Sequence, residues 1–217
     1  MKPEYWDRAK RALARRDVVM KDIMRSRPGV HLTRRGEPFL TLARAICGQQ
    51  ISVKAAQSVW DRICICLDHN ITPEAVAAQD RKKLRACGLS DRKTEYIADL
   101  AQHFADGRIH VHRWPQMSDE EIIAELVEVR GIGRWTAEMF LIFNLLRPDV
   151  FPLDDLGLQK GIRLAYFRGR KVSLKRMKVL GETWRPWRSY ALMRLWSVVL
   201  DEMRPLDLAI SRETKET

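Results

Sequence analysis

The sequence has little that would anchor it in a membrane or crosslink it. No apolar run approaches the roughly 20 residues of a membrane-spanning helix. The charged N-terminus, MKPEYWDRAKRALARRD, lacks the apolar stretch of a signal peptide. The four cysteines show no paired CxxC spacing, which argues against a zinc site; they are Cys47, Cys64, Cys66 and Cys87. We therefore expect an intracellular protein without a membrane span or disulfides.

Acidic residues are also in short supply. The chain has 28 Asp and Glu against 39 Lys and Arg, which gives a net charge of +11 and an isoelectric point near 9.8. This balance favours a polyanionic partner, nucleic acid first and an anionic membrane second, although a solvated basic surface would give the same composition. With 46% hydrophobic residues in 217, the chain can bury a core as one domain or two small lobes.

Signals for β-strands are scarce as well. The segments VHLT near Val30 and RIHVH near Ile109 are short and isolated. Apolar residues instead recur at helical spacing, which predicts an all-α fold with an orthogonal array of helices. The predicted helices cover residues 37–50, 56–67, 118–130, 135–146, 156–167 and 192–199, with another helix start at Thr72-Pro73.

The stretch VRGIGRWTAEMF, Val129 to Phe140, places a compact break between two predicted helices. Gly131 and Gly133 permit unusual backbone angles and leave no Cβ in the way of a ligand, while Ile132 can fill the space between the helices. The next helix begins with backbone N–H groups that have no partner within it, and a phosphate suits them. An ordinary glycine-containing corner between two helices would show the same pattern.

Two adjacent carboxylates follow in DVFPLDDLGLQKG, Asp149 to Gly161. Pro152 restricts the backbone, and Asp154 and Asp155 then lie at the start of the helix predicted over 156–167. Asp at such a place is usually an N-cap, whose side chain accepts hydrogen bonds from the first backbone N–H groups. One of the pair can cap the helix while the other points into a cleft.

Four stretches together resemble the helix-hairpin-helix DNA glycosylases, and most closely the AlkA-like DNA-3-methyladenine glycosylases. They are AICGQQISVKAA (45–56), VRGIGRWTA (129–137), DVFPLDDLGL (149–158) and WRPWRSYALMRLW (184–196), in the family's order over most of the chain. Longer AlkA proteins carry an additional amino-terminal β domain for which this sequence has no room, so the resemblance implies the compact form.

The resemblance implies two helical lobes with DNA in the cleft between them. The central lobe would span roughly residues 37–130, and the second would combine the termini with residues 131–217. The partner would be damaged double-stranded DNA and not a membrane, and the protein a cytoplasmic monomer, nucleoid-associated if bacterial. The hairpin would grip a backbone phosphate, with a monovalent cation at the backbone of Arg130, Gly131 and Gly133 and no other cofactor.

Site residues also follow from the resemblance. Asp155 would be the catalytic carboxylate, and Asp154 the helix cap or a supporting residue. Because a base inside a duplex is inaccessible, the nucleotide must be flipped out, and Gln50, with Ile51 next, is the candidate to fill its place. The residues expected to contact DNA are Gln49, Gln50, Ile51, Gly131, Ile132, Gly133 and Arg134.

The base pocket implied by the family is lined by Trp135, Met139, Leu156, Tyr190 and Trp196. Aromatic walls attract a cationic alkylated base. Met139 and Leu156 stand where the best-known AlkA pocket has tyrosines, so the substrate range can differ. We expect 3-methyladenine more firmly than 7-methylguanine, with ethenoadenine as a further candidate.

Two rival functions remain open. Bifunctional glycosylase-lyases such as endonuclease III have a Lys just after the hairpin, where this chain has Trp135. They often also carry an iron-sulfur cluster on four carboxy-terminal cysteines, whereas the last cysteine here is Cys87, so we expect no such cluster. A non-catalytic helix-hairpin-helix module would explain the charge and the hairpin, but not Asp155 or the tryptophans.

Overall fold

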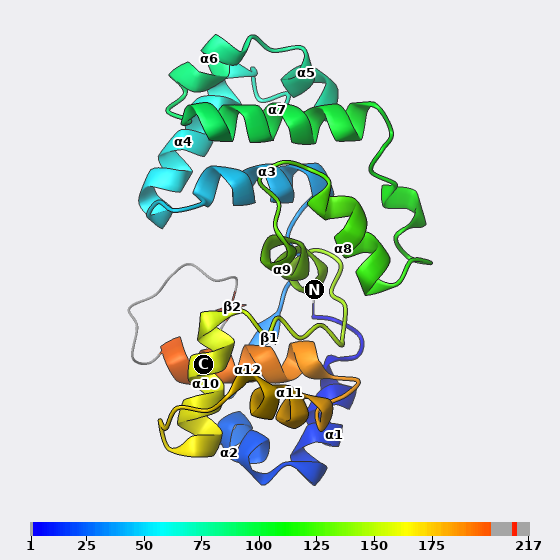
Figure 1. Ribbon diagram of the computed structural model, residues 1–217, viewed down its shortest axis with the longest axis vertical. Coiled ribbons are helices and arrows are strands. Elements are labelled where there is room, and N and C mark those ends of the chain that lie inside the picture. Colours follow the sequence, from blue (N-terminus) through cyan, green and yellow to red (C-terminus); the bar gives the residue numbers. More distant parts are fainter. Residues whose placement is uncertain (1, 201–209, 212–217) are drawn as a thin grey trace, which may run out of the picture. The chain divides into compact units, whose positions relative to one another are not determined.

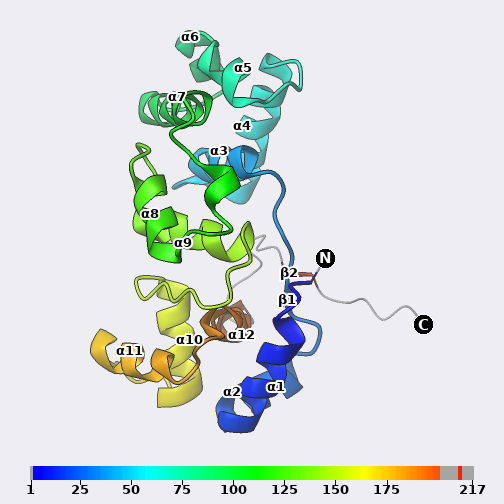
Figure 2. The ribbon, with the colours of Figure 1, turned by 90° about the vertical axis from the view of Figure 1, so that its right-hand side faces the viewer.

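The computed structural model describes residues 2–200 and 210–211, and their regular secondary structure is almost entirely helical (Figures 1 and 2). The chain divides into two compact units. The terminal unit combines Met1–Arg35 with Leu141–Thr217, and the central unit is Gly36–Phe140. The predicted all-α fold is confirmed. No helix of the described residues is both long and apolar enough to cross a membrane.

The central unit is built around one long helix, α7 (Asp91–Ala105), which packs against α3, α5 and α6 (Figure 1). Most helices of the central unit have a serine, threonine or aspartate as N-cap. The capping box predicted at Ser118 is present and pairs Ser118 with Glu121. The remaining elements are α3 (Pro38–Gly48), α4 (Val53–Cys66), α5 (Pro73–Ala77), α6 (Arg81–Ala86), the 3-10 helix η1 (Val111–Arg113), α8 (Asp119–Val127) and the start of α9 (Arg134–Phe143).

The core of the terminal unit is α12 (Arg188–Leu200), in which every residue from Ser189 to Ser197 is buried. It packs against α10, α2 and α1. The other elements are α1 (Trp6–Arg16), α2 (Val18–Ser26), α10 (Leu156–Phe167), α11 (Leu174–Glu182) and the two-residue strands β1 (His31–Leu32) and β2 (Ile210–Ser211), which pair antiparallel. The VHLT segment therefore does form a strand, whereas RIHVH runs into η1.

The boundary between the units differs from the predicted one because α9 contributes side chains to the core of each unit. Its Phe140 ring packs edge-on against Trp114 of the central unit, with centroids 5.3 Å apart. Phe143 stacks with Trp196 of the terminal unit at 5.8 Å. The boundary thus falls after Phe140 and not at residue 130. The start of α9 reaches the surface, where Trp135 is 48% exposed.

Candidate active site

The two glycines of the predicted hairpin connect α8 to α9 for different physical reasons. Gly131 has a φ of +84°, and a Cβ there would lie 2.2 Å from the Tyr96 ring, so no other residue fits without rearrangement. A Cβ on Gly133 would meet nothing within 4 Å. Ile132 is 3% exposed and fills the inner side of the turn, as the sequence predicted. Glycine at 131 is therefore required by the backbone conformation and by packing, whereas glycine at 133 leaves the outer side of the hairpin uncovered.

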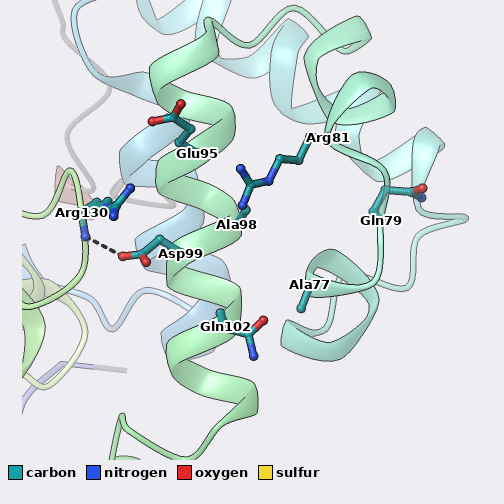
Figure 3. Close-up of a pocket in the computed structure, with 8 residues that line it drawn as sticks. All are labelled: Ala77, Gln79, Arg81, Glu95, Ala98, Asp99, Gln102 and Arg130. Carbon is teal, nitrogen blue, oxygen red and sulfur yellow. Dashed lines mark hydrogen bonds between the residues drawn. The ribbon is translucent and has the colours of Figure 1, made fainter.

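Side chains of the central unit hold the hairpin backbone. The Arg130 N–H donates to Asp99 Oδ2 at 2.8 Å (Figure 3). The Gln49 side-chain amide donates to the Gly131 carbonyl, also at 2.8 Å. A polar cavity of about 240 Å³ opens beside this turn, lined by residues that include Arg130, Asp99 and Arg81. Sequence reasoning missed Asp99, because nothing local in the sequence connects it with the hairpin.

Arg134, predicted to contact DNA, is engaged within the protein. Its guanidinium donates to both oxygens of Glu120, at 2.5 and 2.9 Å, and to Glu138 at 3.2 Å. The hydrogen bonds with Glu120 raise the pKa of Arg134, and in return Arg134 lowers the pKa of the Glu120 carboxyl. A phosphate at this position would therefore compete with Glu120 for the guanidinium.

The loop between α3 and α4 separates the three residues predicted to contact DNA there. Gln49 turns its amide towards the hairpin. Gln50 is exposed and has a left-handed backbone, with φ +58°, and Ile51 is 41% exposed. Beneath the loop, the Lys93 ammonium donates to the carbonyl of Gln49 at 2.6 Å. Of the three, Gln50 and Ile51 have side-chain surface to offer a duplex, and the filling role of Gln50 stays a prediction.

Asp155 in the terminal unit is the N-cap of α10 and is buried, with 6% exposure. Its Oδ1 accepts hydrogen bonds from the Leu158 N–H at 2.5 Å and from the Trp196 Nε1–H at 2.7 Å. Asp154 is exposed and is not the cap. The expectation that Asp154 caps the helix was therefore wrong, because α10 begins at Leu156 and its N-cap is the residue directly before it. Capping and the candidate catalytic role fall on the same carboxylate.

Trp196 contributes a hydrogen-bond donor as well as an aromatic ring. It is 6% exposed, and its ring stacks on Phe143 with an interplanar angle of 22°. A Cβ on Gly157 would lie 2.9 Å from Trp196 Nε1 and 3.1 Å from Asp155 Oδ1. Glycine at 157 therefore leaves the space that the bond between Asp155 and Trp196 needs.

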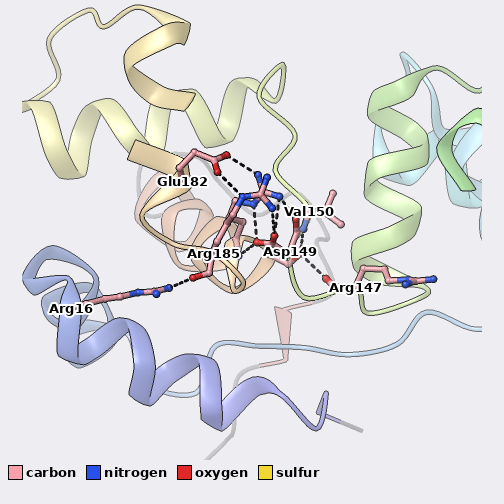
Figure 4. Close-up of polar contacts among 8 residues, drawn as sticks. Arg16, Arg147, Asp149, Val150, Glu182 and Arg185 are labelled. Carbon is pink, nitrogen blue, oxygen red and sulfur yellow. Dashed lines mark hydrogen bonds and ion pairs between the residues drawn. The ribbon is translucent and has the colours of Figure 1, made fainter. Parts of the chain in front are cut away.

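The loop before Asp155 is fastened to the beginning of α12 (Figure 4). Arg188 binds Asp149 through Nε at 2.8 Å and also donates to its backbone carbonyl at 2.7 Å. Arg185 binds the other oxygen of Asp149 at 2.6 Å, and the Ser189 hydroxyl donates to the Arg147 carbonyl. Since α12 also carries Trp196, one helix holds both ends of the loop that presents Asp155.

The remaining predicted pocket residues have different surroundings. Tyr190 is 0% exposed, packs against Trp6 at 4.5 Å and accepts a hydrogen bond from Arg194. It has no surface for a ligand, so its assignment to the base pocket was wrong: the side chain faces α1, whereas Trp196 reaches α10. Leu156, at the start of α10, is 77% exposed. In the central unit, Trp135 is half-exposed and Met139 half-buried.

The hairpin carbonyls are the predicted cation ligands. Gly131 O accepts from Gln49, and Gly133 O accepts from the Ala137 N–H, so each keeps a second lone pair for a ligand. Carbonyl oxygens suit a hard cation, and the turn fits one in chemical terms. Within the described residues, no group of three His, Cys, Asp or Glu could hold a metal ion.

A glycine hairpin between two helices and a buried aspartate that caps a helix after a proline loop fit the helix-hairpin-helix class of DNA repair proteins. The chain belongs to the HhH-GPD superfamily of base excision DNA repair proteins, whose family model matches residues 43–188. It is 37% identical over 177 residues to DNA-3-methyladenine glycosylase 1 of Schizosaccharomyces pombe, covering 78% of this chain and 77% of that protein.

Two solved structures are also similar to this chain. One is the crystal structure of DNA-3-methyladenine glycosidase from Bacillus halodurans, with a TM-score of 0.80, 31% identity and 86% of each chain covered. The other is a Schizosaccharomyces pombe 3-methyladenine DNA glycosylase in complex with abasic DNA, with a TM-score of 0.73 and 33% identity, covering 88% of this chain and 95% of that one.

Proposed function

We propose that the protein is a monofunctional DNA glycosylase that excises alkylated purines, 3-methyladenine first, by hydrolysing the N-glycosidic bond in base excision repair. The observation that carries the proposal is the buried Asp155 carboxylate, fixed by two N–H donors at the start of α10. The names of the relatives support it, since several are DNA-3-methyladenine glycosylases.

Hydrolysis of this N-glycosidic bond requires mainly a correctly positioned negative charge from the protein. An alkylated purine carries a positive charge, leaves as a neutral molecule and needs little acid catalysis. The breaking bond leaves positive charge on the sugar, and a fixed carboxylate stabilises that transition state more than the ground state. Asp155 has this role, and it also orients the attacking water. The hydrogen bonds from the Leu158 N–H and the Trp196 indole hold the carboxylate in place.

The hairpin and the loop between α3 and α4 bind and position the DNA. Gly133 and the first backbone N–H groups of α9 receive a backbone phosphate, which positions the duplex without reading its sequence. Gln50 enters the stack where the nucleotide has left. The partner is damaged double-stranded DNA and the working form is a monomer. A monovalent cation is held by the carbonyls of the hairpin, and the chemistry uses no other cofactor.

The reaction stops at an abasic site because Trp135 occupies the place of the lyase lysine. An indole has no amine to attack the sugar, so this position supplies no nucleophile for strand cleavage. Trp135 is half-exposed and offers the face of its ring to a cationic base. Met139 and Leu156 stand where the best-known AlkA pocket has tyrosines, so we expect 3-methyladenine more firmly than 7-methylguanine, with ethenoadenine as a further candidate.

The first experiment treats a duplex with a methylating agent, identifies the released bases by chromatography, and tests for strand breaks before and after hot alkali. Free 3-methyladenine, with breaks only after alkali, supports the proposal. Breaks without alkali would support a bifunctional lyase. In Asp155→Asn, base release is expected to fall sharply while DNA binding survives. No base release by either form, with salt-sensitive binding, would leave a non-catalytic DNA-binding module.

A further inference from the structure

Helix α7 contacts both segments of the central unit that the proposed function assigns to DNA. Lys93, Tyr96 and Asp99 recur every third residue and so share one face of the helix. At one end of this face, Lys93 reaches the loop between α3 and α4, and at the other, Asp99 accepts the Arg130 N–H of the hairpin (Figure 3). Tyr96, between them, has its ring where a Cβ of Gly131 would lie.

Lys93 fixes the end of α3. Its ammonium donates to the carbonyl of Cys47 at 2.8 Å and to that of Gln49 at 2.6 Å. The last carbonyls of a helix lack partners within it, and a cation there also complements the helix dipole. Burial lowers the pKa of the Lys93 ammonium, so these two carbonyls compensate for water that the group has lost.

Gln49 connects the loop directly to the hairpin. Its Nε2 donates to the Gly131 carbonyl at 2.8 Å, while its own carbonyl accepts from Lys93. The next residue, Gln50, has the left-handed backbone that non-glycine residues rarely adopt. Such a conformation persists where the surrounding structure determines it. The hydrogen bonds of Gln49 and Lys93 fix the backbone on the amino-terminal side of Gln50.

We propose that Lys93 and Gln49 are positioning residues which hold the loop between α3 and α4 at a fixed place relative to the hairpin. Gln50 then enters the duplex in register with the phosphate that the hairpin grips. The inference rests on the proposed function, because it assigns the loop and the hairpin to one DNA duplex. A loop that is already ordered loses less conformational entropy when it inserts.

The test separates lesion-specific binding from general DNA binding. We would measure the affinity of Lys93→Met and Gln49→Met for two duplexes by fluorescence anisotropy: one undamaged, one with a tetrahydrofuran abasic analogue. The abasic duplex offers a gap for Gln50, whereas the undamaged one tests mainly phosphate contacts. In each variant the preference for the abasic duplex should fall about tenfold, with undamaged binding within about twofold of wild type.

Two controls make the result specific. Arg92→Met removes a positive charge from an exposed position of the same helix and should keep the wild-type preference. Lys93→Arg retains a cationic donor and should restore most of the preference that Lys93→Met loses. Thermal unfolding of each variant checks the fold, because a purely structural defect would weaken binding to both duplexes together.

The outcomes distinguish this inference from the proposed function. If the wild type releases 3-methyladenine and prefers the abasic duplex, but Lys93→Met and Gln49→Met keep that preference, the positioning role is refuted. Equal losses on both duplexes, in step with the melting temperature, would also refute it. If the wild type releases no base, the proposed function itself fails, whatever the variants do.

Discussion

Gly157→Ala tests whether the bond between Trp196 and Asp155 matters for catalysis, because it adds a single methyl group beside that bond. The added Cβ would lie 2.9 Å from Trp196 Nε1 and 3.1 Å from Asp155 Oδ1, whereas ordinary contact begins near 3.4 Å. The indole must therefore retreat by about 0.5 Å. The hydrogen bond of 2.7 Å would then lengthen to about 3.2 Å, the upper end of the usual N–H···O range.

Rate and stability should respond differently to this change. A misplacement of about 1 Å costs roughly 100-fold in rate, so a shift of half that size should slow base release by about tenfold. A hydrogen bond to a charged group contributes about 1.5–3 kcal/mol to the free energy of unfolding, and its weakening loses part of this. Alanine in place of glycine within a helix adds up to about 1 kcal/mol. The free energy of unfolding should therefore fall by only about 1 kcal/mol.

The assay is single-turnover release of 3-methyladenine, with DNA affinity and unfolding measured on the same protein. Trp196→Phe removes the donor but keeps an aromatic ring, and should reproduce the loss of rate. Gly36→Ala is the matched control, since a Cβ there meets nothing within 4 Å. A Gly157→Ala enzyme that releases base within twofold of the wild-type rate would refute the reasoning.

Three further predictions concern other parts of the chain. Gly131→Ala should lower the free energy of unfolding by about 2 kcal/mol or more, because φ is +84° and the Tyr96 ring leaves no space for a Cβ. Gly133→Ala should change the free energy of unfolding by less than about 1 kcal/mol and should bind DNA about tenfold more weakly. Denaturant unfolding and anisotropy would show this, and the opposite assignment of the two effects would contradict it. Glu120→Gln should release the Arg134 guanidinium, tighten DNA binding about two- to threefold at low salt and steepen the salt dependence; an unchanged slope would argue against a phosphate contact. Tyr5→Phe should raise the free energy of unfolding by up to about 1 kcal/mol, because the buried Tyr5 hydroxyl has no hydrogen-bond partner among the described residues; a loss of stability on calorimetry would show that it has one.

The parts of the fold that could be predicted from sequence follow from local rules. The helix over Leu156–Phe167 has the predicted bounds, and the Ser118 capping box is in place, because a cap and a helical period are contained in a few neighbouring residues. α1 was not predicted, although Trp6 and Leu13 have helical spacing within a strongly charged segment.

The parts that could not be predicted depend on contacts between distant residues. Gln49 and Gly131 are 82 positions apart, and no local pattern connects them. Tyr190 was misassigned because α12 is buried on all sides, so its sequence has no polar face to show which residues turn towards a ligand. The cap was expected on Asp154 because the resemblance assigned Asp155 to catalysis, whereas a helix that begins at Leu156 has the residue directly before it as its N-cap.

Asp155 and Leu156 are neighbours with opposite constraints, and this has a consequence for how such proteins diversify. The aspartate is buried and bound by Leu158 and Trp196, so almost any replacement would disturb its surroundings. The leucine beside it is 77% exposed and can change without a packing penalty. Under the proposed function, a substitution at residue 156 would alter which lesions are accepted while the catalytic carboxylate next to it stays in place. Substrate range and chemistry could then evolve separately within a single turn of α10.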